Sequence, residues 1–215
     1  NLNRVVITGR GAVSPYGSGV DKLTNGLWHN QSAVKQMTEW SNIGGLKSNL
    51  AAPCPPLDIK KLLPRSLRRT MGATAIFATL AAQEAINDAR ITPEELQSGE
   101  IVAAIGSTTG SPSAYEAFYQ TYLPEREISK IKSGEFFKMM SHTCSANVCL
   151  ALGIEGQQWA PASACTSAAQ AIGLGYLLIQ TGRQRAMLCG GSDEVQHSVT
   201  GVFDVVKAAS SRNQT

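Results

Sequence analysis

The chain of 215 residues is long enough to bury a sizeable hydrophobic core and falls between the usual lengths of one domain and of two. Hydrophobic residues make up 43% of it, as in globular proteins, and a formal net charge of +3 is too small to predict binding to nucleic acid. Polar residues and glycines interrupt the apolar stretches before a bilayer could be crossed, so neither a membrane span nor an export segment is predicted.

The amino-terminal part predicts a buried strand, a loop and a short helix. A β-branched run at residues 4–8 (RVVIT) predicts the strand, and the following residues are rich in Gly, Ser and Pro. Residues 21–30 place apolar side chains at helical spacing. Between residues 40 and 63 the period is lost and Gly and Pro accumulate, which predicts a surface excursion rather than a second domain.

The middle of the chain predicts a buried helix followed by a buried strand. Residues 68–90 carry small and apolar side chains around much of a helical circumference. Residues 101–105 (IVAAI) form an apolar run of strand length, and GSTTGSP follows at residues 106–112, which we call the glycine loop. Because this order repeats the strand and glycine-rich loop of the amino terminus, we expect a parallel sheet.

The last third predicts a βαβ unit. We expect a helix over residues 135–153, a strand over 158–163, a helix over 166–181 and a strand over 186–189 that ends in two glycines. The expected fold class is therefore α/β, and Cys165 falls at the turn between strand and helix.

Cys165 is the strongest candidate for a catalytic group, at the start of a helix expected to be buried. A thiol attacks as its thiolate, and the unpaired N–H groups and dipole of a first helical turn favour negative charge there. The neighbouring side chains at residues 162–169 (ASACTSAA) are small, so an acyl carbonyl can approach the sulfur and the backbone N–H of Cys165 can donate to an oxyanion. On spacing alone, a packed core cysteine is an equal alternative.

The segment SACTSAAQAIGLGYLLIQTGRQRAMLCGGSDE at residues 163–194 resembles the active-site block of β-ketoacyl-acyl-carrier-protein synthases of types I and II, in the thiolase superfamily. VVITGRGAVSPYGSG at residues 5–19, the glycine loop, and FDVVKAASSRN at residues 203–213 also resemble family segments, so the resemblance covers the whole chain. It implies a thiolase-like layered α/β fold with a mixed, mostly parallel sheet flanked by helices. Residues 1–215 would form the amino-terminal part of this domain, the first half of a duplicated αβαβα architecture whose carboxy-terminal half lies outside the sequence.

The resemblance implies a decarboxylative Claisen condensation in fatty-acid or polyketide chain elongation. Cys165 would accept an acyl group as a thioester, a malonyl group on acyl carrier protein would lose CO2, and the resulting carbanion would attack the thioester. Phe203 matches a family phenylalanine beside the acyl pocket, although a core aromatic is an equal alternative. No cofactor is expected besides phosphopantetheine, which the carrier protein itself bears.

A basic run at residues 60–69 (KKLLPRSLRR) suits docking of an acidic carrier protein or of its phosphopantetheine phosphate, with a solvated helix start as the alternative. Within it, Arg65 and Arg69 fall where the family carries basic carrier-facing residues, whereas Ser66 replaces a basic residue often found nearby. Two residues further along the chain are weaker candidates for the same surface. The docking residues expected are Arg65, Arg68, Arg69, Arg126 and Lys130.

Two histidines and a lysine that serve the reaction in this family lie beyond the segment that matches residues 211–213. The histidines present, His29, His142 and His197, are expected to be structural or exposed. Two alternatives therefore stay open. One is a non-condensing partner subunit like a chain-length factor, which usually replaces the cysteine. The other is a Cys-dependent acyl hydrolase, which needs a histidine within reach of Cys165.

The cysteines are odd in number and lack the spacing of a secreted disulfide framework, so we expect free thiols and a cytoplasmic location. His142, Cys144 and Cys149 superficially suggest a metal site, but no second pair of ligands follows and no metal is expected. An isolated half would expose apolar faces, so we expect a companion segment and a homodimer or a heterodimer with another synthase subunit. The cysteines are Cys54, Cys144, Cys149, Cys165 and Cys189.

Overall fold

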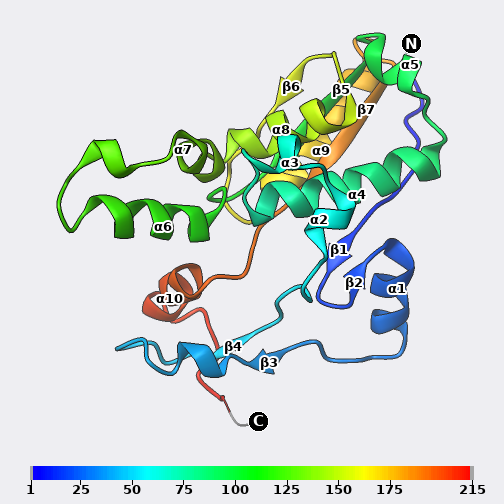
Figure 1. Cartoon of the computed structure of the whole chain (residues 1–215). Helices are drawn as coiled ribbons and strands as arrows, with labels where there is room; N and C mark the ends of the chain where they lie inside the picture. Colours follow the sequence, from blue (N-terminus) through cyan, green and yellow to red (C-terminus); the bar gives the residue numbers. More distant parts are fainter. Residues whose placement is uncertain (1, 214–215) are drawn as a thin grey trace.

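The computed structural model describes residues 2–213 as an α/β fold around a three-stranded parallel sheet (Figure 1). The central strand β5 (Ile101–Gly106) pairs with β6 (Gln158–Trp159) on one side and with β7 (Ala186–Gly191) on the other. Every residue of β5 is buried, as expected for an apolar strand covered on both faces. The register places the last residues of β5 and β7 opposite each other, so their carboxyl ends lie side by side.

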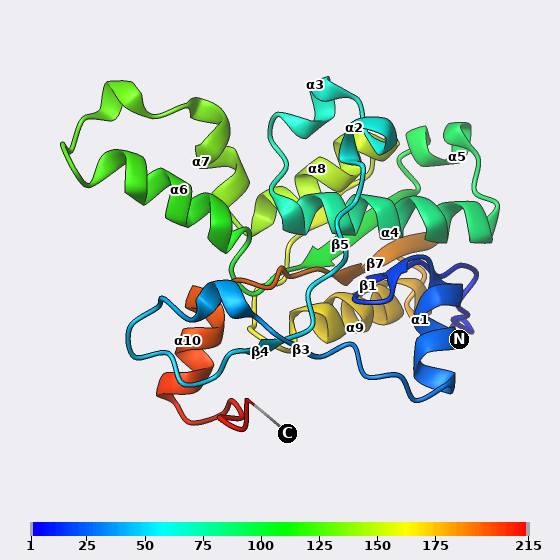
Figure 2. The same cartoon turned by 60° about the horizontal axis from the view of Figure 1, so that its bottom comes forward.

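Helices cover both faces of this sheet (Figure 2). On one face, α4 (Ala73–Ala89) and α8 (His142–Leu152) pack against each other and α8 packs on β5; on the other face, α9 (Ser167–Gln180) packs on β5 and β7. Two apolar clusters fill the space between α4, α8 and the sheet, and Val148 and Ala103 within them are fully buried. The hydrophobic core therefore lies on the α4 and α8 side.

Shorter elements surround these layers. β1 (Val13–Ser14) and β2 (Gly17–Ser18) form an antiparallel hairpin. β3 (Lys35–Gln36) pairs antiparallel with β4 (Leu50–Ala51), and only β4 falls within the surface excursion predicted over residues 40–63. The further helices are α1 (Val20–Trp28), η1 (Thr38–Trp40), α2 (Ile59–Leu62), α3 (Arg65–Arg68), α5 (Pro93–Gln97), α6 (Pro112–Tyr122), η2 (Ile128–Lys130), α7 (Ser133–Met139) and α10 (His197–Val205). Helices α6 and α7 project from the sheet as an arm, residues 112–139 (Figures 1 and 2). Between residues 2 and 213, no helix has both the length and the apolar character needed to cross a membrane.

The helix and the second strand of the predicted βαβ unit are confirmed as α9 and β7, close to their expected bounds, and β5 also matches its predicted strand. The strand predicted over residues 158–163 is too long, because only Gln158 and Trp159 pair with β5 and Ser163 already belongs to the turn before α9. The helix predicted over residues 135–153 is instead two helices, because Met140 is extended (ψ 132°) between α7 and α8. At this break the glycine loop packs so closely that a Cβ on Gly110 would lie 2.2 Å from the carbonyl oxygen of Met139. The break thus makes room for the loop that follows β5.

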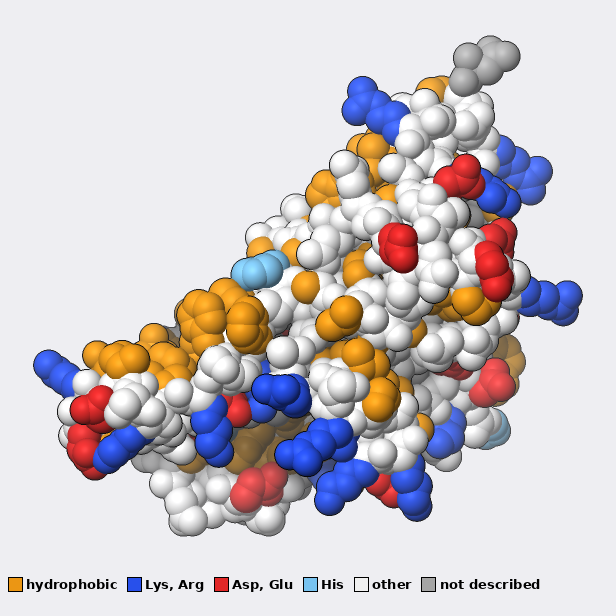
Figure 3. All heavy atoms as spheres, turned by 45° about the horizontal axis from the view of Figure 1, so that its top comes forward, with side chains coloured by type: hydrophobic (Ala, Val, Ile, Leu, Met, Phe, Trp, Pro, Cys, Tyr) orange, Lys and Arg blue, Asp and Glu red, His pale blue; other side chains and the backbone are white. Residues whose placement is uncertain are grey.

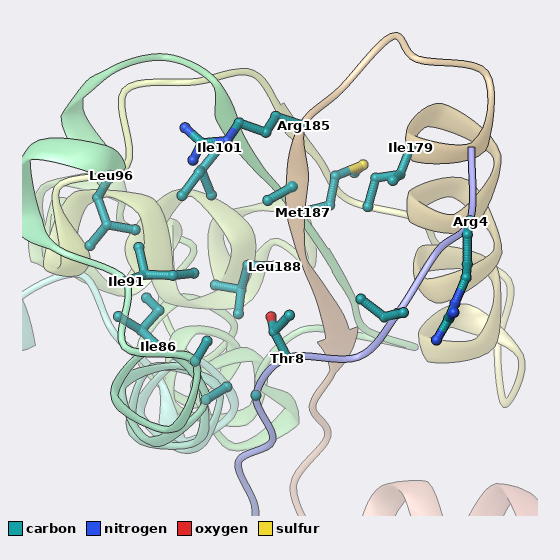
Figure 4. A pocket seen from close by; sticks show the side chains of 15 residues that line it. Arg4, Thr8, Ile86, Ile91, Leu96, Ile101, Ile179, Arg185, Met187 and Leu188 are labelled. Carbon is teal, nitrogen blue, oxygen red and sulfur yellow. The ribbon is translucent and has the colours of Figure 1, made fainter. Parts of the chain in front are cut away.

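The strand predicted over residues 4–8 is wrong. The segment runs beside β7 but joins no sheet, and Asn3 instead donates its N–H to the carbonyl of Gln180 at the end of α9 (2.8 Å). A cavity of about 190 Å³, lined mainly by apolar side chains, separates the segment from β7 (Figure 4). A β-branched run favours extended backbone, but a strand also needs a neighbouring edge within hydrogen-bonding distance. Here Val6 and Ile7 are 57% and 84% exposed.

Candidate active site

Cys165 lies on a tight turn that leads into α9. Ala164 has a φ of 49°, in the left-handed region that residues with side chains rarely adopt, and the chain reverses sharply there. The Ser167 hydroxyl stabilises this turn with two hydrogen bonds. It accepts from the N–H of Ser163 (2.8 Å) and donates to the carbonyl oxygen of Ala164 (2.7 Å). Thr166 Oγ1 also donates to the Ser163 carbonyl (2.8 Å). The turn is thus held by its own side chains, with Cys165 exposed on it.

The carboxyl ends of β5 and β7 pack closely against the residues that follow this turn. A Cβ on Gly106 would lie 2.6 Å from the backbone carbon and oxygen of Ser167, and one on Gly191 would lie 2.7 Å from the Cβ of Ala168. Glycine at the ends of both strands therefore permits the close approach of α9. As a result, the N-terminal turn of α9 sits directly over the end of the sheet.

Two carboxylates that sequence patterns did not single out link the glycine loop to the end of β7. Asp193 and Glu194 follow the two glycines of β7 and each accept three hydrogen bonds from residues 107–113. The signal that could have found them is their place directly after a strand that ends beside the candidate nucleophile.

The five thiols are all free, but their surroundings differ. Burial raises the pKa of Cys144 to about 12 and that of Cys189 to about 11. Burial also raises the pKa of Cys149 and of Cys54. All five lie in the described part of the chain, and among them Cys165 is the exposed one. A buried, protonated thiol is a poor nucleophile, so Cys165 is the thiol best placed to react.

The helix that follows Cys165, α9, is covered on one side. Ala171 is fully buried against the sheet, whereas Ile172, Tyr176 and Leu177 are 56%, 48% and 56% exposed. The prediction of a buried helix is therefore correct only for the sheet-facing side of α9 within residues 2–213. An apolar outer face of this kind is typical of a helix that lies between two layers.

The other predicted site residues lie on separate elements. Phe203 is on α10 and is 42% exposed; α10 lies near the end of the sheet where α9 begins (Figure 2). Two histidines interact elsewhere: His29 Nδ1 lies 2.9 Å from a carbonyl of its own helix, and His197 Nε2 lies 3.6 Å from Glu116. His142 is the exposed first residue of α8. Across residues 2–213, no three His, Cys, Asp or Glu side chains come together in a way that could hold a metal ion.

The basic residues predicted to dock a carrier protein fall in two places. Arg65 and Arg69 are exposed at α3, whereas Arg68 is half-buried and donates its Nε–H to a main-chain oxygen that precedes the helix (2.9 Å). Arg126 and Lys130 lie in the exposed turn between α6 and α7, where Lys130 pairs with a neighbouring glutamate. On the face shown in Figure 3, Lys and Arg side chains gather beside a group of hydrophobic ones.

Comparison with known proteins gives three concordant results. The family model described as the N-terminal domain of β-ketoacyl synthase matches residues 2–215. The crystal structure of a β-ketoacyl synthase from Burkholderia phymatum STM815 superposes with a TM-score of 0.90 at 35% identity, over 99% of this chain and 52% of that one. This likeness confirms the layered, thiolase-like α/β fold that the resemblance implies.

Curated relatives match this chain over a similar share of their own length. The chain is 29% identical to 3-oxoacyl-acyl-carrier-protein synthase 2 of Synechocystis sp. over 190 residues, which are 88% of this chain and 45% of the relative. It is 28% identical to 3-oxoacyl-acyl-carrier-protein synthase 1 of Haemophilus influenzae over 215 residues, all of this chain and 52% of that protein. The chain therefore spans about half the length of the relatives it matches.

Proposed function

This chain belongs to the β-ketoacyl synthase family, and we propose that the protein containing it joins an acyl thioester to malonyl-acyl carrier protein in fatty-acid or polyketide chain elongation. The observation that carries the proposal is the exposed thiol of Cys165, presented on a strained turn at the start of α9 and over the ends of two parallel strands. Such a position combines access for an acyl group with the N–H groups of a helix N-terminus.

In the first half of the proposed reaction, the Cys165 thiolate attacks the carbonyl of an acyl group carried on phosphopantetheine. The new C–S bond forms as the carbonyl π electrons move to oxygen, and the backbone N–H of Cys165 stabilises that oxyanion. Collapse of the intermediate expels the thiolate of the carrier, which takes up a proton. The small side chains at residues 162–169 leave space for this approach.

In the second half, malonyl-acyl carrier protein loses CO2 and the electron pair of the broken C–C bond becomes an enolate. The enolate carbon attacks the carbonyl of the Cys165 thioester, and the sulfur leaves as a thiolate, ready for the next acyl group. The product is a 3-oxoacyl group, two carbons longer, on the carrier protein. Phe203 would contact the acyl chain in its pocket. No cofactor beyond the phosphopantetheine of the carrier protein would be needed.

The test is acyl transfer to Cys165. The full-length protein is incubated with an acyl-loaded carrier protein, and the acyl adduct is located by peptide mass spectrometry. We expect the adduct on Cys165, none with Cys165→Ala, and normal acylation with Cys54→Ala, which removes a half-buried thiol instead. Acylation that persists in Cys165→Ala would refute the assignment, and rapid release of free acid without condensation would favour the hydrolase alternative.

We also propose that Arg65 and Arg69 dock the carrier protein, because both are exposed, Arg65 at the start of α3 and Arg69 directly after its end. Replacing both with glutamate should raise the KM for carrier-bound substrate by about tenfold and leave kcat nearly unchanged, since opposite charge favours encounter rather than chemistry. Arg183→Glu, on an exposed turn after α9, is the matched control and should leave KM unchanged. An equal rise in KM for Arg183→Glu would show a general charge effect.

We further propose that the exposed apolar surfaces are covered in the full protein. The relatives are about twice as long as this chain, so a second half has the size to cover the outer face of α9. The arm carries further exposed apolar side chains, namely Leu123, Ile128, Phe136 and Phe137. These suit contact with a second subunit, as a homodimer or a heterodimer. The presence of Cys165 disfavours a purely non-condensing partner subunit.

A further inference from the structure

The glycine loop is attached to the segment after β7 through Asp193. One carboxylate oxygen accepts from the Ser107 hydroxyl and from the Thr108 N–H, and the other accepts from the Thr108 hydroxyl, each at 3.0 Å. Ser107 is 2% exposed, and its hydroxyl oxygen in turn accepts from the N–H of Gly110 (3.0 Å). Loss of the carboxylate would leave a buried hydroxyl without its acceptor, which is costly.

Glu194 attaches the far end of the same loop. Its side chain accepts from the Ser111 hydroxyl (2.9 Å) and from the N–H of Ser113 (2.8 Å), and it also accepts from the Ser113 hydroxyl. Ser111 is 1% exposed. Both carboxylates are thus satisfied by neutral donors, and no salt bridge to either occurs within the described residues 2–213. Charged acceptors make stronger hydrogen bonds than neutral ones, so the loop is held firmly at both ends.

The loop is continuous with the surface that supports Cys165. It begins at Gly106, which touches the backbone of Ser167, and the N–H of Ser192 donates to the Gly106 carbonyl (3.0 Å). Ser167 closes the turn that bears Cys165. A short chain of direct contacts therefore runs from the carboxylates to the turn, and a shift of the loop would pass to the nucleophile.

We propose that Asp193 and Glu194 are positioning residues: by fixing the glycine loop at both ends, they fix the strand ends on which the Cys165 turn rests. The proposal rests on Cys165 being the acyl acceptor. Neither carboxylate need touch the substrate. They act on the placement of the sulfur. A small displacement of the sulfur from the position that the reaction requires is enough to slow the reaction strongly.

The test compares Asp193→Ala with two matched variants in the full-length protein. Asp193→Asn keeps an oxygen that can accept from Ser107 and Thr108, so it should restore function. Glu95→Ala removes a carboxylate of α5 that accepts the N–H of Thr92 (3.0 Å); α5 precedes β5, whereas the glycine loop follows that strand. It should lower Tm but leave Cys165 unaffected.

Two rates are measured: acylation at saturating acyl-carrier protein, and alkylation of Cys165 by iodoacetamide. For Asp193→Ala we expect acylation to fall about tenfold with KM little changed, and the alkylation rate to change by more than about threefold. Asp193→Asn should stay within about twofold of the natural protein in both. Should Asp193→Ala fail to fold, Thr108→Val removes a single bond to Asp193 and should give a smaller effect of the same kind.

The proposal is overturned if Asp193→Ala acylates and alkylates normally for each folded molecule, or if Glu95→Ala changes both rates as much. The alkylation rate needs no condensation chemistry. It therefore tests positioning even if Cys165→Ala were to show that another residue accepts the acyl group.

Discussion

The two faces of the central sheet are covered by helices of similar length, yet they are built differently. On one face, α4 and α8 pack on each other as well as over the strands, and residues such as Val148 (0% exposed) and Ala75 (4%) are sealed from water. On the other face, α9 forms a single layer, and its outer side chains Ile172 and Tyr176 are 56% and 48% exposed. The first face is a hydrophobic core closed to solvent, and the second carries the candidate active site.

This difference explains why one residue type has two roles in the same fold. Cys144 and Cys149 lie within the core on the α8 side, where burial keeps them protonated. Cys165 lies on the open side, at the end of the sheet where strand ends and a helix start converge. Cys189 on β7 has a raised pKa although its sulfur faces α9, so exposure to solvent, and not the thiol itself or the face of the sheet alone, decides reactivity.

The largest expected effect is in thiol alkylation. With a pKa of about 12, Cys144 is ionised in roughly one molecule in 10⁴ at about pH 8, and it is also shielded from reagent. In a time course with iodoacetamide, read by peptide mass spectrometry, Cys165 should label at least about 10³ times faster than Cys144 or Cys189. Comparable rates at Cys165 and Cys144 would remove the distinction between the two faces. Labelling in urea, where all should react alike, is the control.

The next effect is on stability. Ile86 on α4 is 4% exposed within the core, so Ile86→Ala should lower the free energy of unfolding by about 2–5 kcal/mol. The same change at Ile172 on α9, 56% exposed, should cost less than about 0.5 kcal/mol in residues 1–215. Both are measured by urea unfolding.

The full-length protein sharpens this second comparison. If a second half covers α9, Ile172→Ala should there become about as costly as Ile86→Ala. An effect below about 0.5 kcal/mol in the full-length protein would show that the outer face of α9 stays in water.

The sequence predicted the elements whose signals are local. Residues 101–105 are a continuous apolar run bounded by glycine, and they became β5 within one residue. Helix α6 was missed, although Pro112 begins it and aromatic side chains follow at helical spacing. The strand over residues 4–8 was wrong because a strand depends on a partner edge that local pattern does not encode. Asp193 was missed for a similar reason, since the donors it binds lie 85 and 86 positions away in the chain.

A third effect concerns alkaline pH and tests the burial of Cys144. Its pKa is raised from 9.0 to about 12 on folding, so between these values the unfolded chain releases a proton that the folded chain keeps. The contribution is fully present below about pH 9 and is lost as pH rises, at up to about 1.4 kcal/mol per pH unit. Urea unfolding between about pH 8 and pH 10.5 should therefore show a shallower decline for Cys144→Ala than for the natural protein. Parallel declines would mean that Cys144 titrates normally and that the α8 side is open to water.

The last pair of substitutions distinguishes the two sides of α9 itself. A Cβ on Gly175 would lie 2.4 Å from the sulfur of Cys189, whereas one on Gly173 would meet nothing within 4 Å. Gly175→Ala should therefore destabilise residues 1–215 by about 1–3 kcal/mol through overpacking. Gly173→Ala should stabilise them by about 0.5–1 kcal/mol, because alanine loses less backbone entropy in a helix. Repeating Gly173→Ala in the full-length protein makes the sign of the stability change informative. A gain in stability means that this side of α9 stays open to solvent, and a loss of stability means that another layer packs closely against it.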